Sequence, residues 1–172
     1  MQTKPFTNDQ IASILYEMGV LCDMLGMDYK TRAYELAAGD VKIYPEQLSN
    51  LYQREGIKGL TQVPSVGDRI AKHIEELLTT GHFKEYEEFK KKIPVNLPEL
   101  LLVEGVGPKT IRELYFRLGI RNLQQLEQAC REGKVRTLPR FGVKSEQRIL
   151  KAILTIKAQR REGSHEEEER EK

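Results

Sequence analysis

The sequence predicts an all-α fold made of two small helical subdomains. Apolar residues recur at steps of three and four along several segments, and a glycine follows most of these segments. No segment alternates between apolar and polar residues as a half-buried strand would. The composition, with 39% hydrophobic and 31% charged residues among 172, suits a helical protein with a modest core. We expect the first subdomain over residues 1–93 and the second over residues 94–162.

The first subdomain begins with its clearest helix. Thr7 and Gln10 have the spacing of a capping box, and the apolar residues between Ile11 and Leu25 follow the helical period until Gly26 ends it. The later helices of this subdomain are expected over residues 29–38 with an end at Gly39, from Pro45 onwards, over residues 68–80 with an end at Gly81, and over residues 82–92.

The second subdomain shows the same succession of helices and glycines. Its helices are expected at Pro108–Leu118 before Gly119, at Asn122–Glu132 before Gly133, and at Lys144–Arg161. The last ten residues, 163–172, hold five acidic and two basic side chains and show no apolar period. We therefore expect an acidic tail after the second subdomain that is either disordered or a frayed extension of the last helix.

The charge balance favours a polyanionic partner without identifying it. The whole chain has a formal net charge of +2, but residues 1–162 alone carry 26 basic and 21 acidic side chains. No apolar run is long enough to cross a bilayer, and the N-terminus lacks the apolar stretch of a secretory signal. We therefore expect a cytoplasmic protein with a mildly basic body.

The two cysteines, Cys22 and Cys130, are too few and too far apart in the sequence for a disulfide framework or a zinc site. Cys22 falls on the apolar side of its helical pattern. We interpret both cysteines as small structural residues.

One pattern occurs three times. It consists of an apolar residue, two further residues, a second apolar residue, a glycine and a helix start, as in VPSVGDRI at 63–70, VEGVGPKT at 103–110 and LPRFGVKS at 138–145. The two apolar residues predict a tight turn held against the core. The glycines, Gly67, Gly107 and Gly142, predict a backbone geometry or a close approach that a β-carbon would obstruct. A single such turn usually does no more than join two helices, whereas three in register indicate a shared binding role.

The helix that follows each glycine presents unpaired N–H groups and the positive end of its dipole. Such a helix start binds a phosphate without reading bases. A basic residue two places after the glycine, Arg69, Lys109 or Lys144, can reach the same or the next phosphate. The repeats therefore predict three helix-hairpin-helix motifs that bind the DNA backbone without sequence specificity. The expected DNA contacts are Ser65, Gly67, Arg69, Lys72, Gly105, Gly107, Lys109, Thr110, Arg140, Gly142, Lys144 and Ser145.

With these repeats the sequence resembles the N-terminal region of the family X DNA polymerases, including their bacterial and archaeal members. The likeness covers residues 8–155, through KTRAY at 30–34 and the three repeats. It implies an eight-kilodalton type of domain followed by a fingers, or DNA-binding, subdomain. The polymerase palm of the family needs three aspartates, yet no Asp follows Asp68 in this sequence. The phosphoesterase (PHP) domain of many members is rich in His and Asp, whereas this chain has only three His. Neither domain is expected here, so the chain is a stand-alone module or a fragment, and polymerase activity is not expected of it alone.

The resemblance also implies where DNA would bind. A pocket for a DNA 5′-phosphate would use Lys30, Tyr34 and Arg69, which indicates gapped, nicked or 5′-phosphorylated DNA in base excision repair. No cofactor is required, but hairpin carbonyls would hold a Na+ or K+ ion that bridges to a DNA phosphate. These carbonyls belong to Thr61, Val63 and Val66 in the first hairpin and to Leu101, Val103 and Val106 in the second.

Two alternatives remain open. Some family members remove a 5′-deoxyribose phosphate with a lysine that forms a Schiff base, and that position falls on His73, whose imidazole cannot do so. Lys72 lies beside it, near the Arg69 face of the helix, so a weak abasic-site or deoxyribose-phosphate lyase is one alternative. The other is a DNA-targeting subunit that recruits a separate polymerase or nuclease, through an apolar patch near Tyr115, Phe116 and Leu118.

Overall fold

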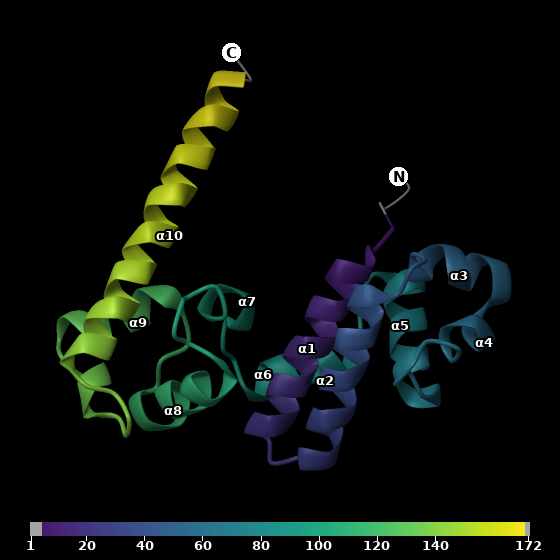
Figure 1. The fold of residues 1–172 in the computed structure, drawn as a ribbon, viewed down its shortest axis with the longest axis horizontal. Coiled ribbons are helices and arrows are strands. Elements are labelled where there is room, and N and C mark those ends of the chain that lie inside the picture. The colour runs from purple at the N-terminus through teal and green to yellow at the C-terminus, as the bar shows by residue number, and fades with distance from the viewer. Residues whose placement is uncertain (1–4, 171–172) are drawn as a thin grey trace. The chain divides into compact units, whose positions relative to one another are not determined.

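The computed structural model describes residues 5–170 of the chain, with side chains from residue 5 to residue 164. Within these residues every regular element is a helix and no strand occurs, which confirms the all-α prediction (Figure 1). The chain divides into two compact units, Met1–Ile93 and Pro94–Lys172. None of the described helices combines the length and the apolar character that a membrane crossing needs.

The first unit is built on a pair of helices, α1 and α2, that lie side by side (Figure 1). Its elements are α1 (Asn8–Met24), α2 (Asp28–Ile43), α3 (Leu48–Glu55), α4 (Ile57–Leu60), α5 (Asp68–Thr80) and α6 (Lys84–Lys92). Gly19 faces α2 where the two helices pack, and a β-carbon at this position would lie 3.4 Å from Cβ of Tyr34, in van der Waals contact. The apolar faces of α1 and α5 are buried in the same unit, with Leu15 and Ile74 fully covered.

Hydrogen bonds at the start of α1 join it to the segment before α3. Thr7 and Gln10 form the predicted capping box, with hydrogen bonds of 2.9 and 3.2 Å. The buried Asn8 side chain accepts a hydrogen bond from Leu48 N at 2.8 Å and donates one to Glu46 O at 2.8 Å. Asn8 thus supplies the cap that α3 lacks in its own sequence.

Two expected helix limits in the first unit are wrong. α2 does not end at Gly39 but continues to Ile43, because the buried Val41 extends the apolar face of the helix. This burial offsets the cost of a glycine inside a helix, which is about 1 kcal/mol. α3 begins at Leu48 rather than at Pro45, at the point where Asn8 accepts the hydrogen bond from its first N–H group.

The second unit is a compact set of short helices followed by one long helix. Its elements are α7 (Leu97–Leu100), α8 (Pro108–Leu118), α9 (Leu123–Arg131), the 3-10 helix η1 (Val135–Thr137) and α10 (Val143–Arg170). Leu100, Ile111, Leu126 and Ile153 are fully buried in its core. Sequence patterns missed α4, α7 and η1, because elements of three or four residues are too short to show a period. Each of these three is the element that precedes a repeat turn.

The acidic tail is helical as far as the structure describes it, which agrees with an extension of the last helix and not with disorder. α10 continues without interruption through Gly163 to Arg170, and residues 171–172 lie outside the described residues. Adding a residue to an existing helix is far easier than starting a new one, and glutamate is a good helix former. The run of glutamates from 166 to 169 therefore extends α10, although it has no apolar face to bury.

Both cysteines are buried and unpaired, in agreement with a structural role. Burial raises the pKa of the Cys22 thiol to about 11, and burial, together with the charges of Glu146 and Glu127, raises the pKa of Cys130 to about 11. Thiols of this kind remain protonated and unreactive at neutral pH.

Candidate nucleic-acid interface

The three repeats form three turns with the same hydrogen bonds. In each turn the N–H of the second apolar residue donates to the carbonyl of the first. These bonds are Val66 N to Val63 O at 3.1 Å, Val106 N to Val103 O at 3.0 Å, and Phe141 N to Leu138 O at 3.1 Å. The glycine carbonyl then accepts the first bond of the following helix, from Ala71 at 2.9 Å, Ile111 at 2.9 Å and Glu146 at 3.0 Å. The predicted repeat is therefore a repeat of backbone geometry.

Each turn places its third residue in the left-handed region. Ser65 has φ 62°, Gly105 has φ 86° and Arg140 has φ 68°. A positive φ at this place, with proline before it as at Pro64 and Pro139, is the pattern of a type II turn. A serine and an arginine bear a conformational cost here of about 1–2 kcal/mol. Strain of this kind persists where a functional site requires the geometry.

The recurrent glycine of the three turns has a different role from the one expected. Gly67 and Gly107 have φ of −82° and −100°, which any residue adopts, so the expectation of a special backbone geometry is wrong for these two. A β-carbon at Gly67, Gly107 or Gly142 would meet no protein atom within 4 Å. The space that a side chain would fill lies open in front of each helix, where a ligand can approach the backbone closely.

The helices after the first two turns begin without a side-chain cap. Gly67 and Gly107 are the N-cap residues of α5 and α8, and neither helix has a side-chain acceptor at this end. Three other helices are capped by their own N-cap side chains, those of Thr7, Asn96 and Asn122. α2 and the four-residue α4 also begin without a side-chain cap, and α4 also follows an open glycine, Gly56. The hairpins differ from both by the turn hydrogen bond that they share. An uncapped start offers free N–H groups to phosphate oxygens.

The turns face solvent and their apolar residues face the core. Val63, Val66, Val103, Val106 and Leu138 are at most 4% exposed. The third turn departs from the other two, because Phe141 is only partly buried. The residues between each apolar pair, at 64–65, 104–105 and 139–140, are all exposed.

The basic residues of the second and third turns are free to contact a ligand. Lys109, Arg140 and Lys144 are exposed, and none of them has an ion-pair partner among the described residues. In the first turn, by contrast, Ser65 donates its hydroxyl to the Asp40 carboxylate of α2, and Arg69 is paired with a glutamate. Of the other expected contacts, Thr110 and Ser145 are half-buried beside their turns.

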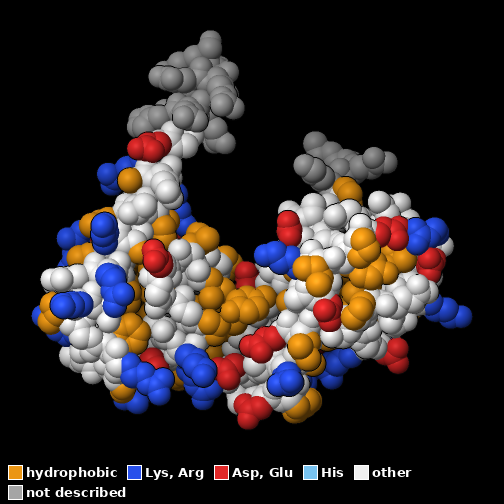
Figure 2. Space-filling model, in the orientation of Figure 1, with side chains coloured by type: hydrophobic (Ala, Val, Ile, Leu, Met, Phe, Trp, Pro, Cys, Tyr) orange, Lys and Arg blue, Asp and Glu red, His pale blue; other side chains and the backbone are white. Residues whose placement is uncertain are grey.

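Positive charge is concentrated in the second unit. The second unit, residues 94–172, carries sixteen basic and twelve acidic side chains, whereas residues 1–93 carry twelve basic and fourteen acidic ones. The excess of positive charge lies in residues 94–162, which hold fourteen basic and seven acidic side chains. Lys and Arg side chains are spread over the surface of the unit that contains α8, α9 and α10 (Figure 2). The net charge of the whole chain does not reveal this difference. The electrostatic attraction for a polyanion therefore comes from the second unit.

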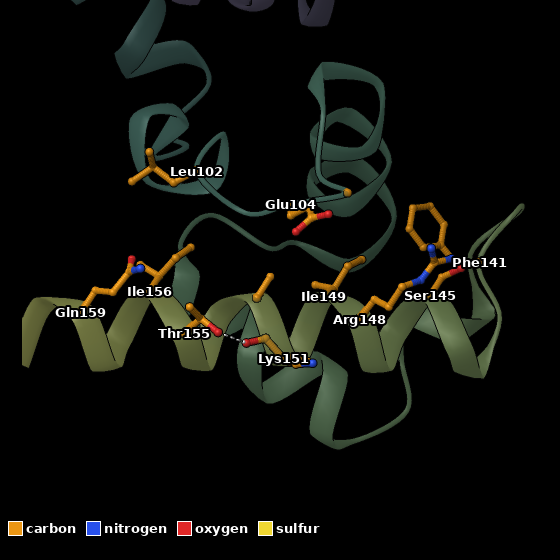
Figure 3. Close-up of a pocket in the computed structure, with 12 residues that line it drawn as sticks. Leu102, Glu104, Phe141, Ser145, Arg148, Ile149, Lys151, Thr155, Ile156 and Gln159 are labelled. Atoms are coloured by element: carbon orange, nitrogen blue, oxygen red, sulfur yellow. Dashed lines mark hydrogen bonds between the residues drawn. The ribbon is translucent and has the colours of Figure 1, made fainter.

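The second and third turns border one groove in this unit. The groove has a volume of about 600 Å³ and is lined by Glu104 and Gly105 of the second turn, by Phe141 of the third, and by α10. Ile149 and Ile156 of α10 point towards the segment that carries Leu102 and Glu104 (Figure 3). Both turns are thus accessible from the same surface, and a single nucleic acid can contact the two together.

Residues of the expected 5′-phosphate pocket meet around a carboxylate that the sequence did not indicate. Glu85 of α6 lies with Oε1 2.6 Å from Arg69 Nη2 and 3.3 Å from Lys30 Nζ. Its Oε2 lies 3.1 Å from Nε2 of His73. We call Lys30, Arg69, His73 and Glu85 the Glu85 cluster. It joins α2, α5 and α6, and no periodic or spacing signal in the sequence could have revealed it.

The cluster is partly buried, and this sets its protonation. Burial alone would raise the pKa of Glu85, but hydrogen bonds and charges from Lys30 and Arg69 outweigh burial and lower it. Burial lowers the pKa of His73, whose ring packs on that of Phe83 at 4.0 Å between centroids. At neutral pH the cluster therefore holds a carboxylate, two cations and a neutral imidazole.

Tyr34 lies beside the cluster with its hydroxyl covered. The residue is 2% exposed, and burial raises its pKa. The Arg69 guanidinium is close enough to lower this pKa in part, but no hydrogen bond of ordinary geometry reaches the Tyr34 hydroxyl within the described residues. A buried hydroxyl without a partner is costly and is a feature that a bound ligand can satisfy.

Lys72 and Phe116 lie outside these arrangements. The Lys72 side chain is exposed and forms no ion pair within the described residues, whereas His73, next to it, belongs to the Glu85 cluster. Phe116 is 55% exposed on α8, and Tyr115 is half-buried with its ring at 75° to that of Phe116.

The carbonyls expected to hold a monovalent ion lie at the turns. Those of Val63 and Val103 each accept the turn hydrogen bond, which leaves a second lone pair on each oxygen. No group of three or more His, Cys, Asp or Glu side chains that could hold a metal occurs in the part of the chain that the structure describes.

Comparisons with known proteins agree with this geometry. Residues 6–83 match the family model of the helix-hairpin-helix domain, and residues 97–153 match that of the SAM-like helix-hairpin-helix tandem. The chain is 30% identical over 144 residues to the DNA polymerase/3′-5′ exonuclease PolX of Bacillus subtilis, which covers 83% of this chain and 24% of the relative. It is 29% identical over 124 residues to DNA polymerase lambda of Arabidopsis thaliana, covering 72% of this chain and 22% of the relative. A DNA polymerase type-X family protein of Schizosaccharomyces pombe is 29% identical over 121 residues, which are 69% of this chain and 22% of the relative. The chain thus spans about a quarter of the length of the relatives it matches.

Proposed function

We propose that this chain, which consists of helix-hairpin-helix domains homologous to a region of the family X DNA polymerases, binds gapped, nicked or 5′-phosphorylated DNA during repair. The observation that carries the proposal is the threefold turn geometry at the protein surface. Two of the following helices start uncapped behind an open glycine, and two of the turns border one groove in the basic unit.

The proposed contact is with the sugar-phosphate backbone. Free N–H groups at the helix starts donate to a phosphate oxygen in place of a side-chain cap, and Lys109 and Lys144 add charge beside the second and third turns. Contacts of this kind to phosphate oxygens carry no sequence information directly. Binding is therefore expected to depend on DNA shape and ends, and little on sequence.

The proposal is tested by fluorescence anisotropy on gapped, nicked and intact duplexes, each with and without the 5′-phosphate. We expect tighter binding to the gapped and nicked forms, and affinity that falls with salt by a slope of about −0.9 for each phosphate neutralised. Lys30→Ala should weaken binding most where the 5′-phosphate is present. Equal affinity for all duplexes, or a strong preference for one base sequence over scrambled ones, would contradict the proposal.

A monovalent ion is part of the proposed contact. Carbonyl oxygens of Thr61, Val63 and Val66, and those of Leu101, Val103 and Val106, are the hard donors that Na+ or K+ prefers. Bound there, the ion would supply a positive charge between the turn and a DNA phosphate. Replacing Na+ and K+ by tetramethylammonium at constant ionic strength should then weaken binding.

The relatives' names support a second proposal about context. They are named as polymerases, one of them also as an exonuclease, and we propose on this ground that the chain serves as a DNA-targeting part for a polymerase or nuclease. Phe116, exposed on α8, is the expected point of contact for such a partner. Loss of polymerase binding in Phe116→Ala, with DNA affinity unchanged, would support this role.

A further inference from the structure

The pocket implied for a DNA 5′-phosphate already contains an anion that belongs to the protein. The two carboxylate oxygens of Glu85 contact Lys30, Arg69 and His73 at 3.3, 2.6 and 3.1 Å. These are distances at which a phosphate oxygen would be held by the same groups. Glu85 therefore occupies the place where two oxygens of a phosphate would lie.

The surroundings of the cluster suit a larger and more highly charged anion than a carboxylate. Tyr34, beside the cluster, is 2% exposed and its hydroxyl has no hydrogen-bond partner within the described residues. His73 Nε2 and Glu85 Oε2 also lack a hydrogen bond of ordinary geometry there, although they lie 3.1 Å apart. The Arg69 side chain is 61% exposed and forms the solvent side of the cluster, while those of Lys30 and Glu85 are 15% and 17% exposed. Arg69 is thus reachable from solvent, whereas Lys30 and Tyr34 lie deeper and are largely covered.

From these contacts we infer that Glu85 is a specificity-determining residue, which competes with a DNA 5′-phosphate for Lys30, Tyr34 and Arg69. The inference rests on the proposed function. A phosphate that enters the cluster must displace the Glu85 carboxylate from two cations and then lie beside a like charge. The wild-type chain therefore favours a 5′-phosphorylated end only weakly, although it carries the residues to bind one.

The expected size of the effect follows from like-charge repulsion. A charge within about 4–6 Å changes the ionisation equilibrium of a neighbour by about one to three pKa units, which is at least about tenfold. Exposure of Arg69 screens part of this interaction, so the lower end of the range applies. Removing the charge of Glu85 should therefore raise the preference for a 5′-phosphate by about tenfold.

The test compares Glu85→Gln with wild type and with the matched control Glu88→Gln. Glu88 is on the same helix, is exposed, and has no ion-pair partner among the described residues, so its replacement removes an equal charge away from the cluster. Anisotropy on one gapped duplex, with a 5′-phosphate or a 5′-hydroxyl, gives two dissociation constants. The ratio compared is that for the 5′-hydroxyl duplex divided by that for the 5′-phosphate duplex, so a higher ratio means a stronger preference for the phosphate. Thermal unfolding checks that each variant is folded. Glu85→Ala provides a second variant that, like Glu85→Gln, lacks the negative charge.

We expect the ratio to rise about tenfold in Glu85→Gln, to stay at the wild-type value in Glu88→Gln, and to lose its rise when Lys30→Ala is added. An unchanged ratio in folded Glu85→Gln and Glu85→Ala, with salt-sensitive DNA binding retained, would overturn the inference alone and leave Glu85 a purely structural link between helices. Absence of DNA binding by the wild-type chain would instead overturn the proposed function, and the inference with it.

Discussion

The carboxylate of Glu146 accepts three hydrogen bonds from Arg136, one from the backbone N–H at 2.8 Å and two from the guanidinium at 2.9 and 2.7 Å. Glu146 lies in the first turn of α10 and is 2% exposed, and Arg136 lies in η1. The pair therefore joins the elements on either side of the third turn.

Glu146→Ala should lower the free energy of unfolding by about 1–3 kcal/mol, because it leaves the Arg136 N–H without its acceptor. The matched control is Glu162→Ala, an exposed position later on α10, for which we expect a change within about 0.5 kcal/mol. Urea unfolding of both variants measures the difference. Equal effects would show that the pair does not hold the hairpin.

The same carboxylate predicts a dependence of stability on pH. Burial opposes ionisation of Glu146, but the hydrogen bonds and charge of Arg136 outweigh burial and lower its pKa. With the folded pKa below the unfolded value of about 4.3, ionised Glu146 stabilises the protein above that value. This contribution is lost as the pH falls through the folded pKa. The stability gap between wild type and Glu146→Ala should therefore narrow from about pH 6 to about pH 3, and a constant gap would contradict the assignment.

Two glycine substitutions should separate binding from stability. Gly107→Ala meets no protein atom and has an ordinary φ, so we expect a stability change within about 0.5 kcal/mol and DNA binding weaker by about tenfold. Gly119 has φ +66° at the end of α8, so Gly119→Ala should cost about 1 kcal/mol and leave DNA binding intact. Urea unfolding and anisotropy on one gapped duplex give both quantities. Unchanged binding by Gly107→Ala would remove the case for close backbone approach at this turn.

Removing charge from the turns of the second unit should change the salt dependence of binding. Lys109→Ala and Lys144→Ala should each reduce the slope of log affinity against log salt by about 0.9, because each removes one phosphate contact. Lys91→Ala, an exposed change on α6 in the first unit, should leave the slope unchanged. The measurement is anisotropy on intact duplex over a range of salt concentrations. Identical slopes for all three variants would place the DNA elsewhere.

Lyase chemistry at Lys72 is not expected. The nucleophilic amine must lie where the sugar of a bound 5′-phosphate is held, and the Lys72 side chain is outside the Glu85 cluster. Borohydride reduction with an abasic duplex should therefore trap no covalent adduct. An adduct in the wild-type chain that disappears in Lys72→Ala would revive the lyase alternative.

Local features were predictable from the sequence because they depend on neighbouring residues. The capping box at Thr7 and Gln10, the threefold turn and the all-α fold each follow from spacing over a few positions. The relative order of apolar residue, glycine and helix start determines the turn hydrogen bonds in the same way in all three repeats. For the same reason the pattern alone was sufficient to locate the candidate interface.

The sequence by itself therefore determined a helical, hairpin-based protein whose helix starts are suited to phosphate. Only the tertiary structure showed that Glu85 lies within reach of Lys30 and Arg69, since these residues come from three different helices whose packing brings them together. The Glu146 bonds to Arg136 and the shared groove of two turns are of the same kind. Contacts of this type depend on how helices pack, and packing is set by the whole buried surface rather than by the spacing of any one segment.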